Sequence, residues 1–161
     1  MTPNLRELLF SDWRHFLSLG LGSGLSPKAP GTMGTLVALP FYFLIRQFNA
    51  PLGWFITGLS LLVGIYICHF TASKLDVEDP SAVVWDEIVA FLMMLLWVKP
   101  QGIGLLWAFL LFRLFDIWKP YPICWADRHI KGGLGIMLDD LLAMFFAVGV
   151  WYSLEGLIVG F

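Results

Sequence analysis

Five long apolar segments, separated by short polar connections, constrain the fold of this chain more than any other feature of its sequence. They cover roughly residues 33–48, 52–70, 82–98, 102–118 and 138–160. Hydrophobic residues make up 58% of the chain and charged residues only 14%, whereas about a quarter of the residues in an ordinary soluble protein are charged. Mean hydropathy is +0.77. A soluble domain of 161 residues could not bury so much apolar surface, so we expect an all-α, polytopic membrane helical bundle of about five apolar helices, with residues 1–161 as a single domain.

The lengths of these segments and the residues that precede them set further expectations. Several segments are shorter than the ~20 residues that a straight span needs, so we expect some of them to be tilted, buried among neighbours or only partly inserted. An amphipathic helix is predicted before them over residues 5–17, lying either on the membrane surface or against the rest of the protein. The first twenty residues lack the apolar core and cleavage site of a signal peptide, so we expect no segment to be removed.

Positive charges lie mostly on one side of this predicted topology. With five spans, residues 1–32, 71–81 and 119–137 share one side, whereas residues 49–51 and 99–101 lie on the other. The first side carries seven cations, namely Arg6, Arg14, Lys28, Lys74, Lys119, Arg128 and Lys131, and the second carries only Lys99. Because cytoplasmic loops of membrane proteins are enriched in Lys and Arg, we expect the first side to face the cytoplasm.

Carboxylates gather on the same predicted side. They precede, begin or end the third, fourth and fifth apolar segments, at Asp79, Asp86, Glu87, Asp116, Asp127, Asp139 and Asp140. Lys28, Thr32, Arg113 and Lys119 belong to that side as well. A bare charge in an apolar medium costs several kcal/mol. A one-sided cluster of acids with a few cations therefore indicates a functional site.

The acids around the third segment have different local explanations. Asp79-Pro80 has the form of an N-cap followed by proline at the first helical position. If the helix begins there, Asp86 and Glu87 lie about two turns inside it, where they cannot act as caps. A structural role is therefore harder to find for these two carboxylates than for Asp79.

The acids of the fourth and fifth segments also have structural alternatives. Asp139 and Asp140 could lie at a helix N-terminus, where the helix dipole favours anions. Asp116 lies near a helix C-terminus, where the dipole disfavours an anion, so it needs a cation. That cation is either Arg113, one turn earlier on the same face, or a bound metal ion.

The residue types around these acids favour some ligands and exclude others. Carboxylates without cysteine or histidine partners are typical of a hard cation such as Mg²⁺, and the isolated Cys68 and Cys124 and the scattered His15, His69 and His129 have no zinc-site spacing. Two glycine-rich loops, GLSPKAPGTMGT and KGGLGIMLDD, could bring backbone N–H groups to a phosphate. The net charge of −2 and the absence of a basic stripe argue against nucleic acid as a partner.

Four motifs in this order, GLSPKAPGTMGTL, DPSAVVWDEIVA, FRLFDIWKPYP and GGLGIMLDDLLA, resemble the phosphatidylglycerophosphatase A family. The likeness runs from about residue 20 to about residue 145. Ala90 stands where the family pattern has a glycine, and Met33 where a bulkier or aromatic residue is usual. Neither departure touches a polar group, so only the closeness of helix packing at Ala90 is put in doubt.

The resemblance implies an Mg²⁺-dependent lipid phosphatase of the bacterial inner membrane. Such an enzyme hydrolyses phosphatidylglycerophosphate in the bilayer to phosphatidylglycerol and inorganic phosphate, a step of phospholipid biosynthesis, at an active site that faces the cytoplasm. We expect catalytic and metal-binding roles for Asp86, Glu87, Asp116, Asp139 and Asp140. We expect substrate-binding roles for Lys28, Thr32, Arg113 and Lys119.

Two mechanisms and two other functions stay open at this point. Phosphorus could be attacked by a metal-activated water or by a carboxylate that forms an aspartyl-phosphate intermediate. A membrane phosphotransferase is one alternative, although the chain has neither GxxxxGK(S/T) nor DGxxAR. A non-catalytic membrane protein that binds lipid or Mg²⁺ is the other, because the same acids would serve it.

Overall fold

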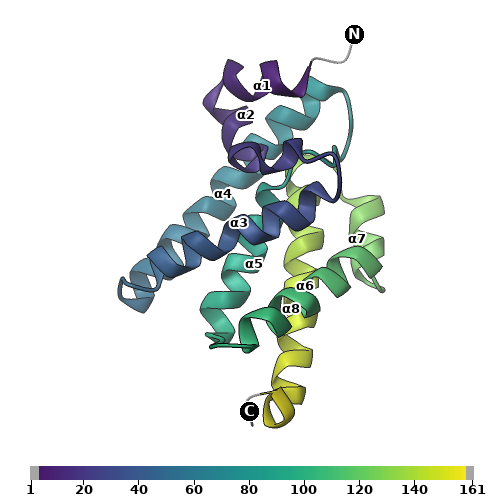
Figure 1. The fold of residues 1–161 in the computed structure, drawn as a ribbon. Coiled ribbons are helices and arrows are strands. Elements are labelled where there is room, and N and C mark those ends of the chain that lie inside the picture. The colour runs from purple at the N-terminus through teal and green to yellow at the C-terminus, as the bar shows by residue number, and fades with distance from the viewer. Residues whose placement is uncertain (1–3, 159–161) are drawn as a thin grey trace.

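The computed structural model describes the backbone of residues 4–158 and the side chains of residues 4–155. Within this range all regular structure is helical, which confirms the all-α prediction (Figure 1). The elements are α1 (Leu5–Ser11), α2 (Trp13–Ser18), the 3₁₀ segment η1 (Gly20–Leu25), α3 (Pro30–Ile45), α4 (Ala50–Leu75), α5 (Trp85–Val98), α6 (Gly104–Trp118), α7 (Ile123–His129) and α8 (Gly132–Ile158).

The five predicted apolar segments correspond to α3, α4, α5, α6 and α8, but the expectation of about five membrane spans is wrong. Within residues 4–158, only α4 and α8 are long and apolar enough to cross a membrane, judged by length and composition. Helices α3, α5 and α6 contain 16, 14 and 15 residues. At about 1.5 Å per residue, each is shorter than the roughly 30 Å hydrocarbon core of a bilayer. The bundle therefore contains two candidate spans and three shorter apolar helices.

The predicted amphipathic helix over residues 5–17 is divided into α1 and α2. Asp12 has an extended backbone and caps the start of α2, where its side chain accepts a hydrogen bond from the Arg14 backbone N–H at 2.9 Å. The Arg14 guanidinium also pairs with the Asp12 carboxylate at 2.6 Å. Aspartate is a favoured N-cap because its carboxylate satisfies an N–H group that the helix leaves free. This cap breaks the periodic apolar pattern into two short helices.

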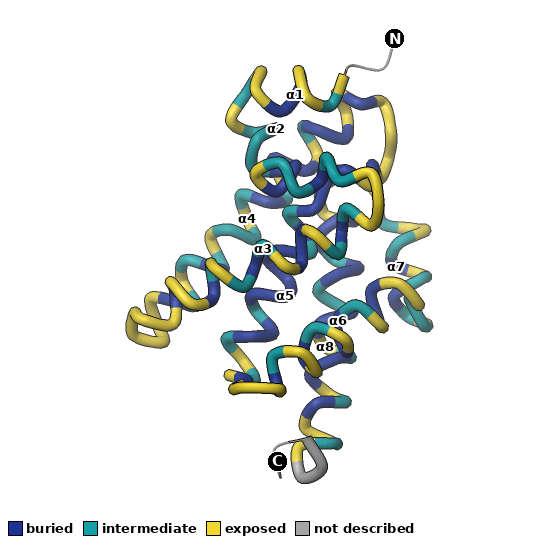
Figure 2. Tube along the Cα trace, viewed as in Figure 1, coloured by how far each residue is buried: buried dark blue, intermediate teal, exposed yellow. Residues whose placement is uncertain are grey.

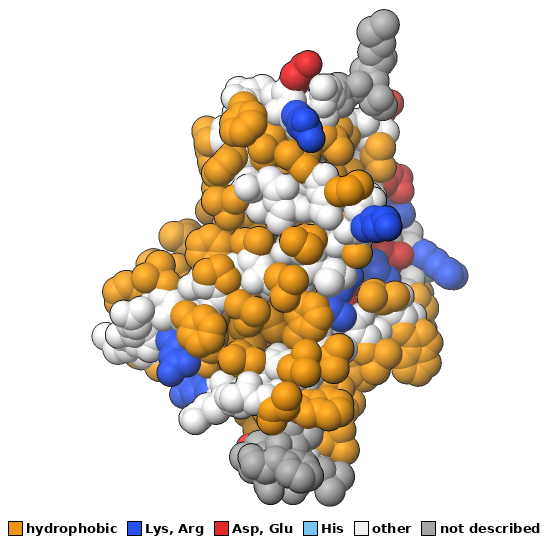
Figure 3. Space-filling model, in the orientation of Figure 1, with side chains coloured by type: hydrophobic (Ala, Val, Ile, Leu, Met, Phe, Trp, Pro, Cys, Tyr) orange, Lys and Arg blue, Asp and Glu red, His pale blue; other side chains and the backbone are white. Residues whose placement is uncertain are grey.

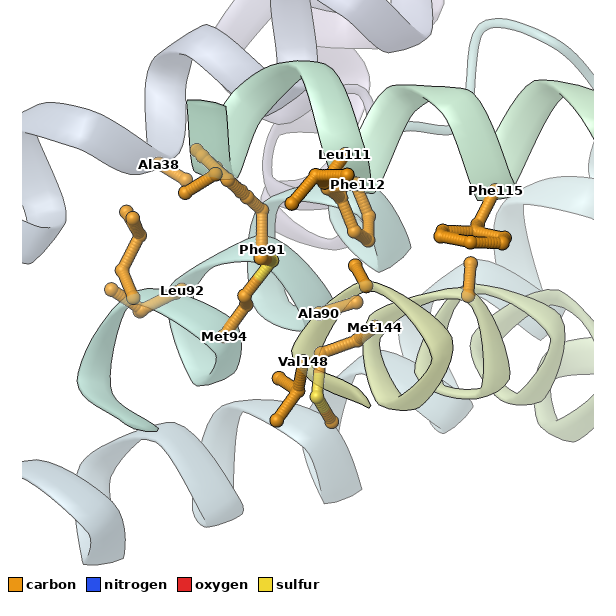
Figure 4. Close-up of a cluster of buried hydrophobic side chains, with 14 of the residues drawn as sticks. Ala38, Ala90, Phe91, Leu92, Met94, Leu111, Phe112, Phe115, Met144 and Val148 are labelled. Atoms are coloured by element: carbon orange, nitrogen blue, oxygen red, sulfur yellow. The ribbon is translucent and has the colours of Figure 1, made fainter. Parts of the chain in front are cut away.

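Helices α5 and α8 form the centre of the bundle. Helix α8 packs against α4, α5, α6 and α7, and α5 also packs against α3 and α4. Buried segments concentrate where these helices cross (Figure 2). The largest core joins Phe91 and Met94 of α5 to Phe112 of α6 and Met144 of α8 (Figure 4).

A glycine allows the first turn of α8 to approach α4 closely. A Cβ atom built on Gly133 would lie 1.8 Å from the Ile65 carbonyl oxygen. Only a residue without a side chain allows two backbones to come so near each other. Gly133 therefore has a packing role. The predicted contact of its loop with phosphate stays a prediction.

The outer surface and the two ends of the bundle have different characters. Only 28% of the 18-residue apolar window of α4 is buried, against 56% of that of α8, and hydrophobic side chains cover much of the face shown in Figure 3.

At one end, the connection from α3 to α4 lies beside the connection from α5 to α6, and the two line a common cavity. The start of α3, the start of α5 and the end of α6 line a cavity with Asp139 and Asp140 of α8.

Candidate active site

The start of α5 places two carboxylates in the cavity that Asp139 and Asp140 of α8 also line. The helix begins at Trp85, with Val84 at the N-cap position, so the prediction that Asp79 caps a helix beginning at Pro80 is wrong. The Val84 N–H instead donates to the Ser18 carbonyl at 2.9 Å, which ties this point to the N-terminal helices. Asp86 and Glu87 consequently lie in the first turn rather than two turns inside, and the positive end of the helix dipole faces them.

The opposite correction applies to the acids of α8. This helix begins at Gly132, so Asp139 and Asp140 lie about two turns inside it and not at its N-terminus. Both carboxylates are buried, with exposed fractions of 5% and 2%. Stabilisation by the helix dipole fades within the first turn. The helix dipole therefore contributes little to balancing these two charges.

The end of α6 contributes one acid and two cations. Asp116 is buried in the last turn, as predicted, and Arg113 lies one turn before it. Lys119 follows the helix as its C-cap, with a left-handed backbone at φ 44°. The backbone therefore leaves the helix at Lys119, whose side chain lines the same cavity as those of Arg113 and Asp116.

All five predicted catalytic acids line one cavity of about 230 Å³, although they come from three helices. Arg113 and Lys119 line it too, together with the backbone turn at Ala29, Pro30 and Gly31. The one-sided gathering of acids expected from the sequence is therefore present in the fold. The roles of the individual acids depend on which neighbours each one contacts.

Asp86, Glu87 and Asp140 form a tight carboxylate cluster. Each offers an oxygen atom, and these atoms all lie within 4.8 Å of one another. Asp86 Oδ1, Glu87 Oε2 and Asp140 Oδ2 are buried and make no hydrogen bond within the described part of the chain. Three close carboxylates with unpartnered oxygens are costly unless a cation lies between them. This cluster is therefore the best-formed place for a hard metal ion among the described residues.

Asp116 has a cation of its own. The Arg113 guanidinium contacts the Asp116 carboxylate directly and also lies 3.9 Å from Glu87 Oε1. The side chains of Arg113 and Asp116 are only 13% and 11% exposed, so this is a largely buried pair. Arg113, one of the two cations that the sequence offered Asp116, is therefore in contact with its carboxylate.

Asp139 is paired as well. Lys119 Nζ donates to Asp139 Oδ2 at 2.5 Å and to Asp127 Oδ1 at 2.7 Å. Burial alone would lower the pKa of the Lys119 ammonium, but Asp139 and Asp127 together raise its pKa above the ordinary range. Lys119 therefore stays charged and holds α7 against α8. Asp139 Oδ1 remains buried without a hydrogen-bond partner among the described residues.

The cavity does not include every predicted site residue. Lys28 is exposed and Thr32 half-buried, and neither side chain lines the cavity, although the residues between them do. Their predicted contact with substrate stays a prediction. His69 lies against Gly132 on the α4 side and does not line the cavity either.

Two residues around Arg113 were missed from the sequence. The Thr35 hydroxyl, fully buried in α3, donates to the Gly31 carbonyl at 2.9 Å and accepts from Arg113 Nη1 at 3.4 Å. A Cβ atom built on Gly31 would lie 2.1 Å from Glu87 Oε1, so a side chain there would displace the Glu87 carboxylate. The available signal was a threonine among apolar residues, one turn after a glycine. That pattern alone does not say which distant side chain the threonine contacts.

The sequence pattern of the phosphatidylglycerophosphatase A family matches residues 16–155, which contain all the acids of this cavity. The chain belongs to this family. It is 41% identical over 147 residues to phosphatidylglycerophosphatase A of Escherichia coli, an alignment that covers 91% of this chain and 86% of that protein. The resemblance noted in the four motifs is thereby confirmed, and this family member is a phosphatase.

Two further relatives cover most of the chain. Phosphatidylglycerophosphatase A of Haemophilus influenzae is 36% identical over 159 residues, which are 96% of this chain and 98% of that protein. A protein of Bacteroides thetaiotaomicron named putative phosphatidylinositol-3-phosphatase is 42% identical over 138 residues, 79% of this chain and 84% of its own. No solved structure matches this family member.

Proposed function

We propose that this protein is an Mg²⁺-dependent lipid phosphatase that hydrolyses phosphatidylglycerophosphate to phosphatidylglycerol and inorganic phosphate. One observation carries the proposal: a cluster of three carboxylates, two buried and one half-buried, lies beside Arg113 in a cavity of a protein from a phosphatase family. Two relatives named phosphatidylglycerophosphatase A support the choice of substrate. We place the reaction in phospholipid biosynthesis at the bacterial inner membrane, with the cavity facing the cytoplasm.

The three-carboxylate cluster fits Mg²⁺ in donor type and in charge. Mg²⁺ prefers oxygen ligands, and it is usually held by a few carboxylates while it keeps several waters. Asp86, Glu87 and Asp140 would hold the ion, because each has a buried oxygen without another partner among the described residues. When bound, Mg²⁺ supplies Lewis acidity toward phosphoryl oxygens and lowers the pKa of a coordinated water.

Arg113 is the group we assign to the phosphate. Its Nε is buried and makes no hydrogen bond within the described residues, whereas Nη1 is held by Asp116 and Thr35. A guanidinium held in this way neutralises phosphate charge without a further loss of side-chain freedom. Asp116 would then act through Arg113, as a positioning residue, rather than as a metal ligand.

Asp139 and Lys119 lie beside the three-carboxylate cluster and complete the proposed site. Lys119 adds a positive charge to the cavity and fixes the Asp139 carboxylate through Oδ2. Asp139 Oδ1 is left without a partner among the described residues, and we assign it to accept the proton of the attacking water. As the water oxygen bonds to phosphorus, the bond from phosphorus to the glycerol oxygen breaks, and solvent protonates the leaving oxygen.

The surroundings of the cavity suit a lipid substrate. Ile117 lines the cavity and is 70% exposed. Its neighbours Leu114 and Trp118 are 51% and 68% exposed. Acyl chains could remain along this apolar surface while the headgroup reaches the acids, since large exposed apolar patches mark membrane or lipid contacts.

Phosphate release by the protein purified in detergent tests the proposal. We expect release from phosphatidylglycerophosphate with Mg²⁺ and none with a chelator, and Asp86→Asn should abolish it. Phosphatidylinositol 3-phosphate is the matched competing substrate, because the Bacteroides relative carries the name of such an enzyme. Faster release from the inositol lipid would show that phosphatidylglycerophosphate is not the preferred substrate. Full activity in the chelator would show that the reaction does not need Mg²⁺.

A further inference from the structure

A second cavity, at the other end of the bundle from the acids, has a different chemistry. It lies where the connection between α3 and α4 meets the connection between α5 and α6, and we call it the connector pocket. Twelve residues, eight of them within 42–54 and four within 96–101, line it, and its volume is about 320 Å³. Pockets for small ligands measure about 300–1,000 Å³, so this one can hold a headgroup-sized molecule.

The connector pocket contains two cations and no carboxylate among its described lining residues. Arg46 and Lys99 line it, and neither forms an ion pair within the described residues. The sequence explains why: residues 13–75 and 88–115 contain no Asp or Glu, so both cations lie in segments free of acids. A group of Lys and Arg side chains lies between these two connections in Figure 3, apart from any acidic side chain on that face.

Helix dipoles balance only part of this positive charge. Arg46 caps the C-terminus of α3 and Lys99 caps that of α5, each facing about half a negative charge. The pocket also contains the N-terminus of α4, which adds about half a positive charge. An excess of roughly one and a half positive charges remains in the pocket.

Neutral donors and an apolar wall surround the cations. Tyr42 is only 4% exposed and lines the pocket, and its hydroxyl makes no hydrogen bond within the described residues. Asn49 accepts a hydrogen bond from the Leu52 N–H through its carbonyl oxygen, which leaves its NH₂ group as a donor. Phe48 and Trp54 supply apolar surface beside these donors.

We propose that the connector pocket binds a phosphate ester, either the headgroup phosphate of an anionic lipid or a soluble glycerol phosphate. Arg46 and Lys99 neutralise the phosphate, and the Tyr42 hydroxyl donates to one of its oxygens. Charge-assisted hydrogen bonds of this kind are the stronger ones in proteins. The aromatic wall contacts the glycerol part of the ligand.

This inference does not depend on the proposed function. None of the residues lining the connector pocket lines the acidic cavity. Loss of binding in the connector pocket should therefore leave phosphate release unchanged. If the phosphatase proposal failed, the inference about the connector pocket would be unaffected.

Native mass spectrometry of the protein purified in detergent can count the bound ligands. We expect the wild type to retain one phosphatidylglycerol more than the double variant Arg46→Gln/Lys99→Gln. The matched control Lys74→Gln/Arg128→Gln removes the same charge from exposed positions outside both cavities and should retain the lipid. Tyr42→Phe, which keeps the buried ring, should weaken binding about tenfold through one lost hydrogen bond to a charged group.

Two further ligands identify the source of the phosphate. Phosphatidylcholine carries a phosphate but no net charge, so it should not be retained. Glycerol 3-phosphate should displace the anionic lipid if both use the connector pocket, and its binding without retained lipid would assign the pocket to a soluble ester. Equal lipid retention by the double variant and the control would overturn the proposal, as would the absence of any ligand that depends on Arg46, Lys99 or Tyr42.

Discussion

Gly31 lies so close to Glu87 that a Cβ atom on the glycine would stand 2.1 Å from Glu87 Oε1. Gly31→Ala must therefore displace the carboxylate, and the same Cβ atom would lie 3.2 Å from Arg113 Nη1. A displacement of about 1 Å in a reacting site can cost a hundredfold in rate. We expect turnover to fall by about that factor while the protein still folds, since alanine suits a helix.

Gly58→Ala is the matched control for this change. A Cβ atom there meets nothing within 4 Å, so turnover should match that of the wild type. Steady-state phosphate release by both variants measures the effect. A Gly31→Ala enzyme as active as the Gly58→Ala enzyme would show that the position of Glu87 does not matter to the reaction.

The three-carboxylate cluster predicts a common effect for three substitutions. Asp86→Asn, Glu87→Gln and Asp140→Asn each remove one charge from atoms that lie within 4.8 Å of one another. Each should lower turnover at least about a hundredfold and raise the Mg²⁺ concentration needed for half activity. Glu78→Gln should have little effect, because Glu78 is an exposed partner of Lys131. Near-normal activity in all three cluster variants would leave these acids with a structural role alone.

Variants of Arg113 and Asp116 distinguish a role in charge balance from a role in catalysis. Arg113→Met or Asp116→Leu alone leaves a buried charge without its partner and should cost about 3–5 kcal/mol of stability, whereas the double variant should recover most of it. Thermal unfolding in detergent measures the recovery. We expect no recovery of phosphatase activity, because Arg113 also lines the cavity beside Glu87. An active double variant would mean that the two charges only balance each other.

His15 predicts a pH dependence of stability. It is buried, its Nδ1 lies 2.8 Å from the Thr71 hydroxyl, and burial lowers its pKa below the ordinary value. The folded protein therefore disfavours the protonated ring. Its contribution is fully present above about pH 6.5, the ordinary value for histidine, and falls as the pH drops below it.

A comparison of variants isolates this effect. The midpoint of thermal unfolding should fall more steeply between about pH 6.5 and pH 5 in the wild type than in His15→Gln. His129 is exposed, so His129→Gln should keep the wild-type slope. The same slope in His15→Gln as in the wild type would exclude His15 as the source.

The sequence by itself determined the class of the fold, the order of its apolar helices and the family. Apolar runs bounded by proline, glycine and polar residues predicted α3, α4, α5, α6 and α8, because local composition decides which segments must be buried or face lipid. It also predicted that the acids share one end of the bundle, since each acid lies at or near an end of an apolar segment. The shortness of several segments was visible in the sequence as well, but the helix bounds in the fold identified α3, α5 and α6 as the short ones.

Only the tertiary structure decided where two helices begin and which partner each acid has. Helix α5 begins at Trp85 because the Val84 N–H bonds to the distant Ser18 carbonyl, a contact that the Asp79-Pro80 pattern does not encode. The division of the acids follows in the same way. Arg113 reaches Asp116, Lys119 reaches Asp139, and the carboxylates of Asp86, Glu87 and Asp140 lie together, because ion pairing depends on distances that helix packing sets.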